Sequence, residues 1–238
     1  MKKILVVVAI LIFIVGCHKA PNHMARQVIM PFKSIEVSGN TAVELVNGPY
    51  SANNNNRITV TDQVLHVAAP SSTNNSIVKV FAPGLKSITV IGSATVNAKD
   101  FKTTGLTVTA KGSGTVNLEG HYVIDKIYQS GNGRINIGWI DSDNLFVDSR
   151  SGGPVCLSGT VNSMVAKLTN NAYFDARYLR VQRASVFTTD KAHADIVVLD
   201  TLGAFAIDNS NIFYYKRPHN LTIVTNNSGN VLQPDWIR

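Results

Sequence analysis

The sequence predicts an all-β fold: a single-stranded, right-handed β-helix with coils of about 19 residues and a β-strand capping module at its N-terminal end. Three observations lead to this prediction. Apolar and polar residues alternate in short strands, a small or turn-forming residue separates consecutive strands, and the whole unit returns at a nearly constant interval. One unit cannot bury its apolar face alone, so successive units must stack to form a core.

The clearest copy of the unit begins at Leu106. Apolar and polar residues alternate over Leu106–Lys111, the glycines of Gly112–Gly114 interrupt the strand, and the alternation resumes over Thr115–Glu119. The unit is therefore a strand, a glycine corner, a second strand and a loose return.

Aligning later copies on this unit produces columns of equivalent residues. The column of Val116 contains Val96, Val116, Ile135, Val155, Phe174, Ala194, Ile212 and Val231. Eight positions earlier stand Ile88, Val108, Ile127, Val147, Ala166, Val186, Ala204 and Ile223. The corner column is Gly92, Gly112, Gly131, Ser151, Asn170, Asp190, Asp208 and Asn227. The corners lie 20, 19, 20, 19, 20, 18 and 19 residues apart, which indicates a solenoid.

The spacing also selects the class of solenoid. Leucine-rich repeats have a similar length but require an LxxLxLxxN pattern, which no coil contains. Helical repeats require longer units and apolar residues at a 3.6-residue period. A strand-rich coil of about 19 residues fits a β-helix, whose coils stack at the strand spacing of about 4.8 Å.

The N-terminus has the features of an export signal. Lys2 and Lys3 precede the apolar run Ile4–Val15, whose twelve residues are fewer than the ~20 that span a bilayer as a helix. The segment Ile14–Cys17 resembles the bacterial lipobox, which implies lipidation at Cys17. Ordinary secretion with an incidental cysteine is the alternative. His18, in place of aspartate, favours the outer membrane by resemblance to enterobacterial lipoproteins.

Charge and cysteine content limit the function further. Loss of Lys2 and Lys3 with the signal lowers the formal net charge from +7 to +5, and no basic run reaches three residues, so we expect no nucleic-acid partner. If Cys17 carries lipid, Cys156 has no disulfide partner. Cys156 lies between two inward columns and should face outward, either as a shielded thiol or as a reactive one.

The region before Gly84 departs from the period. Phe32–Gly48 matches the column spacing and predicts a first coil, but 53 residues separate Gly39 from Gly92. Three short strand patterns follow, around Ile58, Leu65 and Val78. We expect these strands to cap the open end of the helix, which would otherwise be an adhesive strand edge.

Several segments carry a family resemblance. Phe32–Gly48, Val78–Ile88, Gly92-Ser93 and Gly112–Gly114 resemble the putative auto-transporter adhesin, head GIN domain family. The resemblance implies an exported or lipid-anchored β-helical bacterial protein of unknown function, with adhesion suggested by the family name. It implies no functional residue, and the corners from Gly131 onward depart from the full Gly-Ser-Gly pattern of the family.

The sequence does not favour an enzyme. Polysaccharide-degrading β-helices need clustered carboxylates with an Arg or Lys on one outer sheet. This chain has three glutamates, and the Asn-Thr-Asp, Asp-Asp and His-Gly motifs of polygalacturonase-like enzymes are missing. We therefore predict no catalytic residues and no cofactor.

One outward column suggests a weak alternative site. It contains Asn97, Asn117, Asn136, Cys156, Asp175, Asp195, Phe213 and Leu232. His193, two positions before Asp195, shares this face with Asp195 and Asp175, and two carboxylates with an imidazole could hold a divalent metal. A solvated polar face is the simpler interpretation, so we predict no metal site.

A second outward feature is apolar and lies in the late coils. It contains Phe146, Val165, Phe187, Phe205 and Val224, named here the late strip. An exposed apolar strip is typical of an interface. The tail Val231–Arg238, with Trp236 and Ile237, could instead fold over it.

The combined interpretation is a signal peptide over residues 1–16, a lipid-anchored tether over 17–30, and a β-helix domain over 31–238. Within the domain, 31–84 form the first coil and the capping strands, and 85–238 form about eight coils. We expect a non-catalytic, adhesin-like binding module of the bacterial cell envelope, held to the membrane by its N-terminal lipid. Its partner is a glycan, an envelope or surface protein, or a second copy. A carbohydrate-active β-helix enzyme and a purely structural envelope protein are the alternatives.

Overall fold

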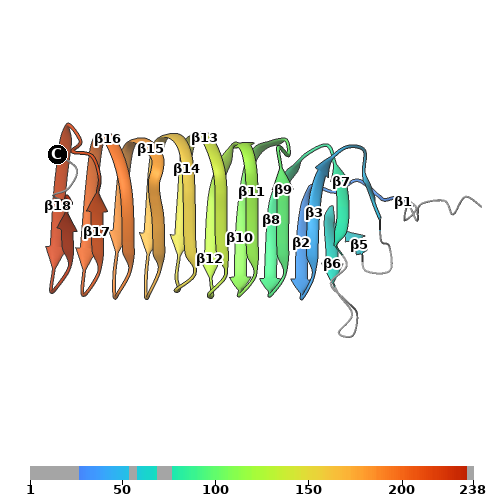
Figure 1. Cartoon of the computed structure of the whole chain (residues 1–238), viewed down its shortest axis with the longest axis horizontal. Helices are drawn as coiled ribbons and strands as arrows, with labels where there is room; N and C mark the ends of the chain where they lie inside the picture. Colours follow the sequence, from blue (N-terminus) through green and yellow to red (C-terminus); the bar gives the residue numbers. More distant parts are fainter. Residues whose placement is uncertain (1–26, 54–57, 69–76, 235–238) are drawn as a thin grey trace, which may run out of the picture.

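The structure, a computed structural model, describes residues 27–53, 58–68 and 77–234. All regular elements in these ranges are β-strands, which confirms the all-β class (Figure 1). The strands are β1 (Gln27–Val28), β2 (Ser34–Gly39), β3 (Ala42–Asn47), β4 (Ser51–Ala52), β5 (Ile58–Thr61), β6 (Val64–Ala68), β7 (Val78–Ala82), β8 (Leu85–Gly92), β9 (Thr95–Lys99), β10 (Thr103–Gly112), β11 (Thr115–Tyr122), β12 (Ile124–Ser130), β13 (Arg134–Ser149), β14 (Pro154–Leu168), β15 (Tyr173–Thr188), β16 (His193–Ile207), β17 (Asn211–Tyr214), β18 (Asn220–Asn226) and β19 (Asn230–Leu232).

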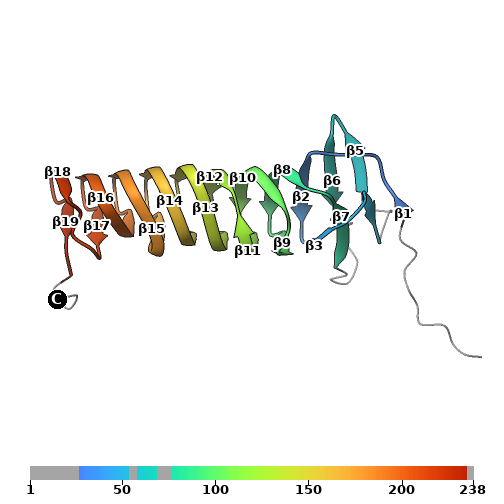
Figure 2. The ribbon, with the colours of Figure 1, turned by 90° about the horizontal axis from the view of Figure 1, so that it is seen from above.

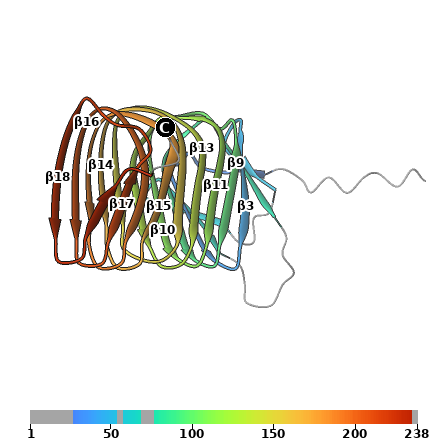
Figure 3. The same cartoon turned by 60° about the vertical axis from the view of Figure 1, so that its left-hand side comes forward.

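The strands stack in parallel as a solenoid, and its coils follow one another along the long axis (Figures 1 and 3). One ladder joins β2, β8, β10 and β12, then the second halves of β13–β16, and ends at β18. The other joins β3, β9 and β11, then the first halves of β13–β16, and ends at β17 and β19. We call them the first and second ladders.

The columns predicted from the sequence are confirmed residue by residue. Val116 pairs with Val96 on one side and Ile135 on the other, and the same register continues through to Val231. Val108 likewise pairs with Ile88 and Ile127 in the first ladder. The inward columns are buried except at the C-terminal coil, and burial of each Val, Leu or Ile side chain contributes about 1.5–3 kcal/mol.

The corner column has the backbone conformation that its composition predicts. Asn170, Asp190, Asp208 and Asn227 all have φ between 53° and 62°, a region that Asn and Asp tolerate better than other side chains. At Gly131 φ is 119°, and a Cβ would lie 2.2 Å from the carbonyl oxygen of Gly112. The early coils therefore approach too closely at this corner for any residue but glycine.

The N-terminal module contains a coil placed out of sequence order. β6 and β7 stack in parallel on one side of β2 and β3, while β8 and β9 stack on the other side. Gly39 and Gly92 are therefore register partners although 53 residues separate them in the sequence. β5 and β4 pair antiparallel with β6 and β7, and β1 pairs with β4, so strands cover this end of the stack (Figure 2).

The predicted signal, Cys17 and most of the tether lie outside the described residues, as do Trp236 and Ile237. Within the described ranges, no helix is long and apolar enough to cross a membrane.

Candidate functional site

A groove runs along the outer face of the second ladder, with a volume of about 890 Å³. One side of the groove is an outward column that the sequence predicts in register, extended by Glu44 of the first coil. Its members along the groove are Glu44, Asn97, Asn117, Asn136, Cys156 and Asp175. These six rungs span about 24 Å at the usual strand spacing.

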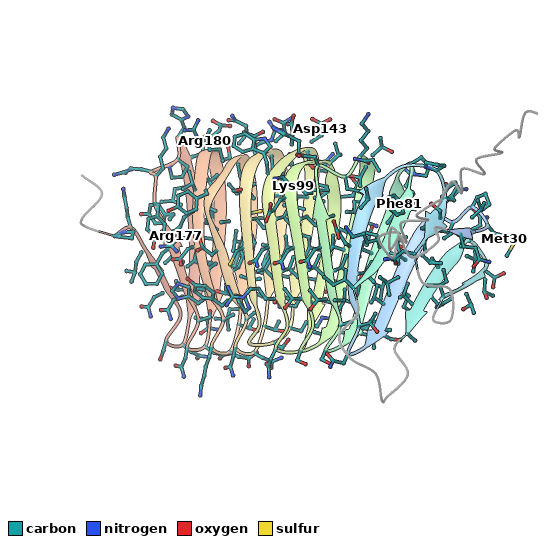
Figure 4. All side chains as sticks on the ribbon, turned by 45° about the vertical axis from the view of Figure 1, so that its right-hand side comes forward. Met30, Phe81, Lys99, Asp143, Arg177 and Arg180 are labelled. Carbon is teal, nitrogen blue, oxygen red and sulfur yellow. The ribbon has the colours of Figure 1, made fainter. Side chains whose placement is uncertain are left out.

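The other side of the groove lies two residues further along each coil, or three in β15. Its members are Lys99, Glu119, Gly138, Ser158 and Tyr178. Near these positions the parallel register shifts, between Leu118 and His121 in β11, between Ile137 and Ile140 in β13, and between Asp175 and Tyr178 in β15. Such irregularities bend a strand, so the outer face is concave here and not flat. Lys99 and Arg177 lie along this face in Figure 4, whereas Asp143 and Arg180 project from the upper edge.

Asn97, Asn117 and Asn136 form a row of hydrogen-bonded side chains, the asparagine ladder, which connects three coils inside the groove. The Nδ2 atom of Asn117 donates to Oδ1 of Asn97 at 2.9 Å, and Nδ2 of Asn136 donates to Oδ1 of Asn117 at 2.8 Å. Each amide has two N–H groups and two lone pairs, and the asparagine ladder uses at most one of each per residue. Further donors and acceptors therefore remain in the groove.

Two of the groove's carboxylates are ion-paired. Glu44 lies 3.0 Å from the Nζ atom of Lys79. Asp175 accepts two hydrogen bonds from the Arg177 guanidinium, at 2.9 and 2.6 Å, and these bonds lower its pKa. Cys156 lies between them on the groove wall, half-buried and facing outward as predicted. Burial raises the pKa of its thiol, and the negative charge of Asp175 raises it further.

The structure brings His193 and Asp195 together but does not form a metal centre from them. Asp195, 4% exposed, lies 3.1 Å from Nε2 of His193 and accepts hydrogen bonds of 3.1 Å from the hydroxyls of Tyr173 and Tyr215. Asp175 is engaged by Arg177 instead. No group of three His, Cys, Asp or Glu side chains suited to a metal occurs in the described ranges.

This cluster is a compact polar network. Burial raises the pKa of Asp195, but the hydrogen bonds from His193, Tyr215 and Tyr173 outweigh burial and lower it overall. Burial and the charge of Asp195 raise the pKa of Tyr173 to about 12. The His193 ring lies between the rings of Tyr173 and Phe213, with centroids 5.2 and 5.1 Å away. The network therefore holds consecutive coils together at the end of the groove.

The late strip lies on the first ladder, in two neighbouring columns. In one column Phe146 pairs with Val165. In the next outward column, two positions further along each strand, Phe187 pairs with Phe205 and Phe205 pairs with Val224. The rings of Phe187 and Phe205 stack with centroids 4.6 Å apart and planes 9° from parallel. Phe187 is 37% and Val224 46% exposed in the described structure.

The sequence identifies the outward column of groove residues but not the groove itself. It gives no sign that this column borders a hollow. The hollow depends on the bends at Glu119, at Gly138 and between Asp175 and Tyr178, and no residue type marks all three places. The strip and the His193–Asp195 pair, in contrast, follow directly from residue type and register.

Comparison with solved structures supports the fold. A putative adhesin from Parabacteroides distasonis is similar with a TM-score of 0.77 and 19% identity, over 88% of this chain and 95% of that one. A putative lipid binding protein from the same species has a TM-score of 0.74 and 18% identity, over 89% and 96%. A putative adhesin from Parabacteroides merdae has a TM-score of 0.74 and 19% identity, over 89% and 95%.

No curated protein matches the sequence. Residues 31–218 match the family described as putative auto-transporter adhesin, head GIN domain, in agreement with the resemblance found in the sequence. This match covers most of the chain, and the chain therefore belongs to the putative auto-transporter adhesin, head GIN domain family.

Proposed function

We propose that the chain is a non-catalytic, adhesin-like binding module of the bacterial cell envelope, anchored by lipid at Cys17 and facing the periplasm or the cell surface at the outer membrane. The family and two of the similar structures, named as adhesins, support a surface or envelope protein. The lipobox-like segment Ile14–Cys17 supports the anchor.

The observation that carries the binding role is the groove. It continues over six rungs of the second ladder, about 24 Å, and is open along its length. Small-molecule sites are usually enclosed pockets, whereas a groove of this length suits an extended chain. The extended ligand would lie along the solenoid axis, crossing the asparagine ladder and Cys156.

The alternative of a carbohydrate-active enzyme has less support. A general acid in such an enzyme needs a carboxyl group with a raised pKa. Of the four carboxylates that line the groove, two are unsuited to this role: Arg177 holds Asp175 as a carboxylate and lowers its pKa, and Glu44 is ion-paired with Lys79. The third alternative, a purely structural envelope protein, provides no reason for an elongated groove.

The late strip favours a second contact, with a lipid surface. Phe187 and Val224 are exposed, and the ammonium group of Lys167 lies 5.9 Å from the centre of the Phe146 ring. Exposed aromatic rings beside lysines are suited to an anionic membrane surface. One similar structure is named a putative lipid binding protein, which is consistent with this second role.

Alkylation of Cys156 provides a direct test of the groove. The purified full-length chain is incubated with a soluble extract of bacterial envelope polymers, and labelling of Cys156 by iodoacetamide is followed by mass spectrometry. The proposal expects slower labelling with the extract in the wild type and no slowing in Gly138→Leu, which fills the groove. Equal labelling rates with and without extract in the wild type would overturn it.

Gly138→Leu is suited to this test because an added Cβ meets only ordinary contacts of 3.4 Å or more and its φ lies outside the left-handed region. Asn162→Ala is the matched control. Asn162 is exposed and donates to Asp143 at 2.6 Å, outside the groove, so its replacement should leave protection unchanged.

A further inference from the structure

The asparagine ladder provides both hydrogen-bond donors and acceptors to the groove. Asn117 uses one N–H on Asn97 and accepts one bond from Asn136, which leaves it one N–H and one lone pair for a ligand. The same applies in part to Asn97 and Asn136 at the two ends of the ladder. A ligand that follows the groove therefore meets a donor and an acceptor at each of three coils.

The charges along the groove disfavour an anionic ligand. Its charged lining residues are four carboxylates and one ammonium group: Glu44, Asp100, Glu119, Asp175 and Lys99. Arg177 and Lys79 compensate Asp175 and Glu44 by direct ion pairs. A polyanion would still have to approach Asp100, Glu119 and the amide oxygens, and it would find a single lysine there.

An extended peptide also fits the groove poorly. Peptides that bind β-proteins in extended form usually add to the edge of a sheet, where backbone N–H and C=O groups are free. The groove lies on the face of the second ladder, and the strands beneath it, β11, β13 and β14, pair with neighbours on both sides. The groove contacts a ligand mainly through side chains.

Hydroxyl groups match the groove better than either alternative. A hydroxyl both donates and accepts, so it can satisfy an N–H and a lone pair of the same amide. Tyr178, 77% exposed, lines one end and presents an aromatic ring, to which the C–H face of a sugar ring can pack.

From these features we infer that the groove binds an uncharged, linear, polyhydroxylated glycan, whose sugar units follow the coils from Asn97 towards Tyr178. This inference rests on the proposed function, namely that the groove is the binding site, and adds the chemical class of the ligand. The asparagine ladder contacts the hydroxyls, and Tyr178 holds one sugar ring.

A panel of defined polymers tests the ligand class. The purified full-length chain is screened on an array of neutral linear glycans, with cellohexaose, xylohexaose and chitohexaose as soluble probes. Hexagalacturonate and an extended uncharged peptide of similar length are the comparison probes. Binding is measured by calorimetry, and occupancy of the groove by protection of Cys156 from iodoacetamide. At least one neutral glycan should bind and protect Cys156, and neither comparison probe should do so.

Two variants place the glycan in the groove. Gly138→Leu should weaken glycan binding by about tenfold or more because it occupies the space of the ligand. Asn117→Ala should weaken it by about threefold to tenfold, since it removes one donor and one acceptor and breaks the ladder. Asn162→Ala should bind as the wild type does. Circular dichroism and thermal melting verify that each variant is folded.

The outcomes separate this inference from the proposed function. Protection of Cys156 by hexagalacturonate or the peptide, with no neutral glycan active, would overturn the ligand class but keep the groove as the site. Glycan binding that neither protects Cys156 nor responds to both groove variants would overturn the placement. Absence of binding by every neutral glycan, while the envelope extract still protects Cys156, would overturn the inference alone.

Discussion

Asn117 and Asn97, one coil apart, are joined by a hydrogen bond between side-chain amides with an Nδ2–Oδ1 distance of 2.9 Å. Asn136 makes the same bond to Asn117 from the next coil. These residues occupy an outward column, yet Asn117 and Asn136 are only half-exposed because they line a groove. The asparagine ladder thus both links coils and forms a surface for binding.

The register of the columns predicts a large difference between adjacent positions. Ile135 is fully buried, so Ile135→Asp should cost about 3–5 kcal/mol by placing an unpaired charge in the core. Asn136→Ala should cost about 1 kcal/mol, because it removes a single bond to Asn117. Urea denaturation measures both. Equal losses in the two variants would show that the register is wrong.

The corner glycines predict a second contrast. Gly131→Ala should destabilise the protein by about 1–3 kcal/mol or more, since φ is 119° and the Cβ meets the Gly112 carbonyl oxygen. Gly138→Ala should change the melting temperature little, because its Cβ has room. A similar melting temperature for wild type and Gly131→Ala would contradict the close approach of the coils.

The network around Asp195 predicts sensitivity to acid. The pKa of Asp195 is lower in the folded protein than the ordinary 3.8, so its stabilising contribution is present above that value and is lost as pH falls through the folded-state pKa. Asp195→Asn should cost about 1–3 kcal/mol at pH 7, and the cost should shrink towards pH 3. Urea midpoints at both pH values provide the measurement. A cost independent of pH would assign the effect to packing alone.

The late strip predicts an effect on association without an effect on folding. Phe187→Ser combined with Phe205→Ser should reduce co-sedimentation with anionic phosphatidylglycerol vesicles several-fold, because the variant removes both stacked rings. The β-type circular dichroism should persist, since both side chains face outward. Unfolding of the double variant would instead indicate that the chain's own tail covers the strip.

The lipobox-like segment predicts the anchor. Cys17→Ser should abolish incorporation of labelled palmitate, because the thiol is the acceptor of the lipid. The apolar run Ile4–Val15 is too short to span a bilayer by itself as a helix. Labelling that persists in the variant would rule out lipidation at Cys17.

Much of the stack follows from the sequence because the apolar columns of Val116 and Val108 and the corner column keep the same phase. The pairing of Val116 with Val96 and Ile135, and the positive φ of Asn170 and Asp190, are consequences of that phase. The stacking order at the N-terminus does not follow, because alternation marks β6 and β7 as strands but not their neighbours. Their position outside β2 and β3 depends on a chain reversal that the period does not encode.

The groove shows a second limit of the sequence. Asn136 has the residue type expected of a solvated outward position, and the sequence alone implies that its replacement is nearly neutral. In the structure it donates to Asn117 and lines the groove. The strand bends that create the groove depend on how β11, β13 and β14 shift register, which residue types along one coil do not determine.

The most direct test of the account is a crystal structure of the chain with the neutral glycan that binds most tightly in the array. We predict sugar units along the groove, with hydroxyls in hydrogen-bond contact with Asn97, Asn117 and Asn136 and one ring against Tyr178. A glycan located on the late strip, or anywhere outside the groove, would contradict the account.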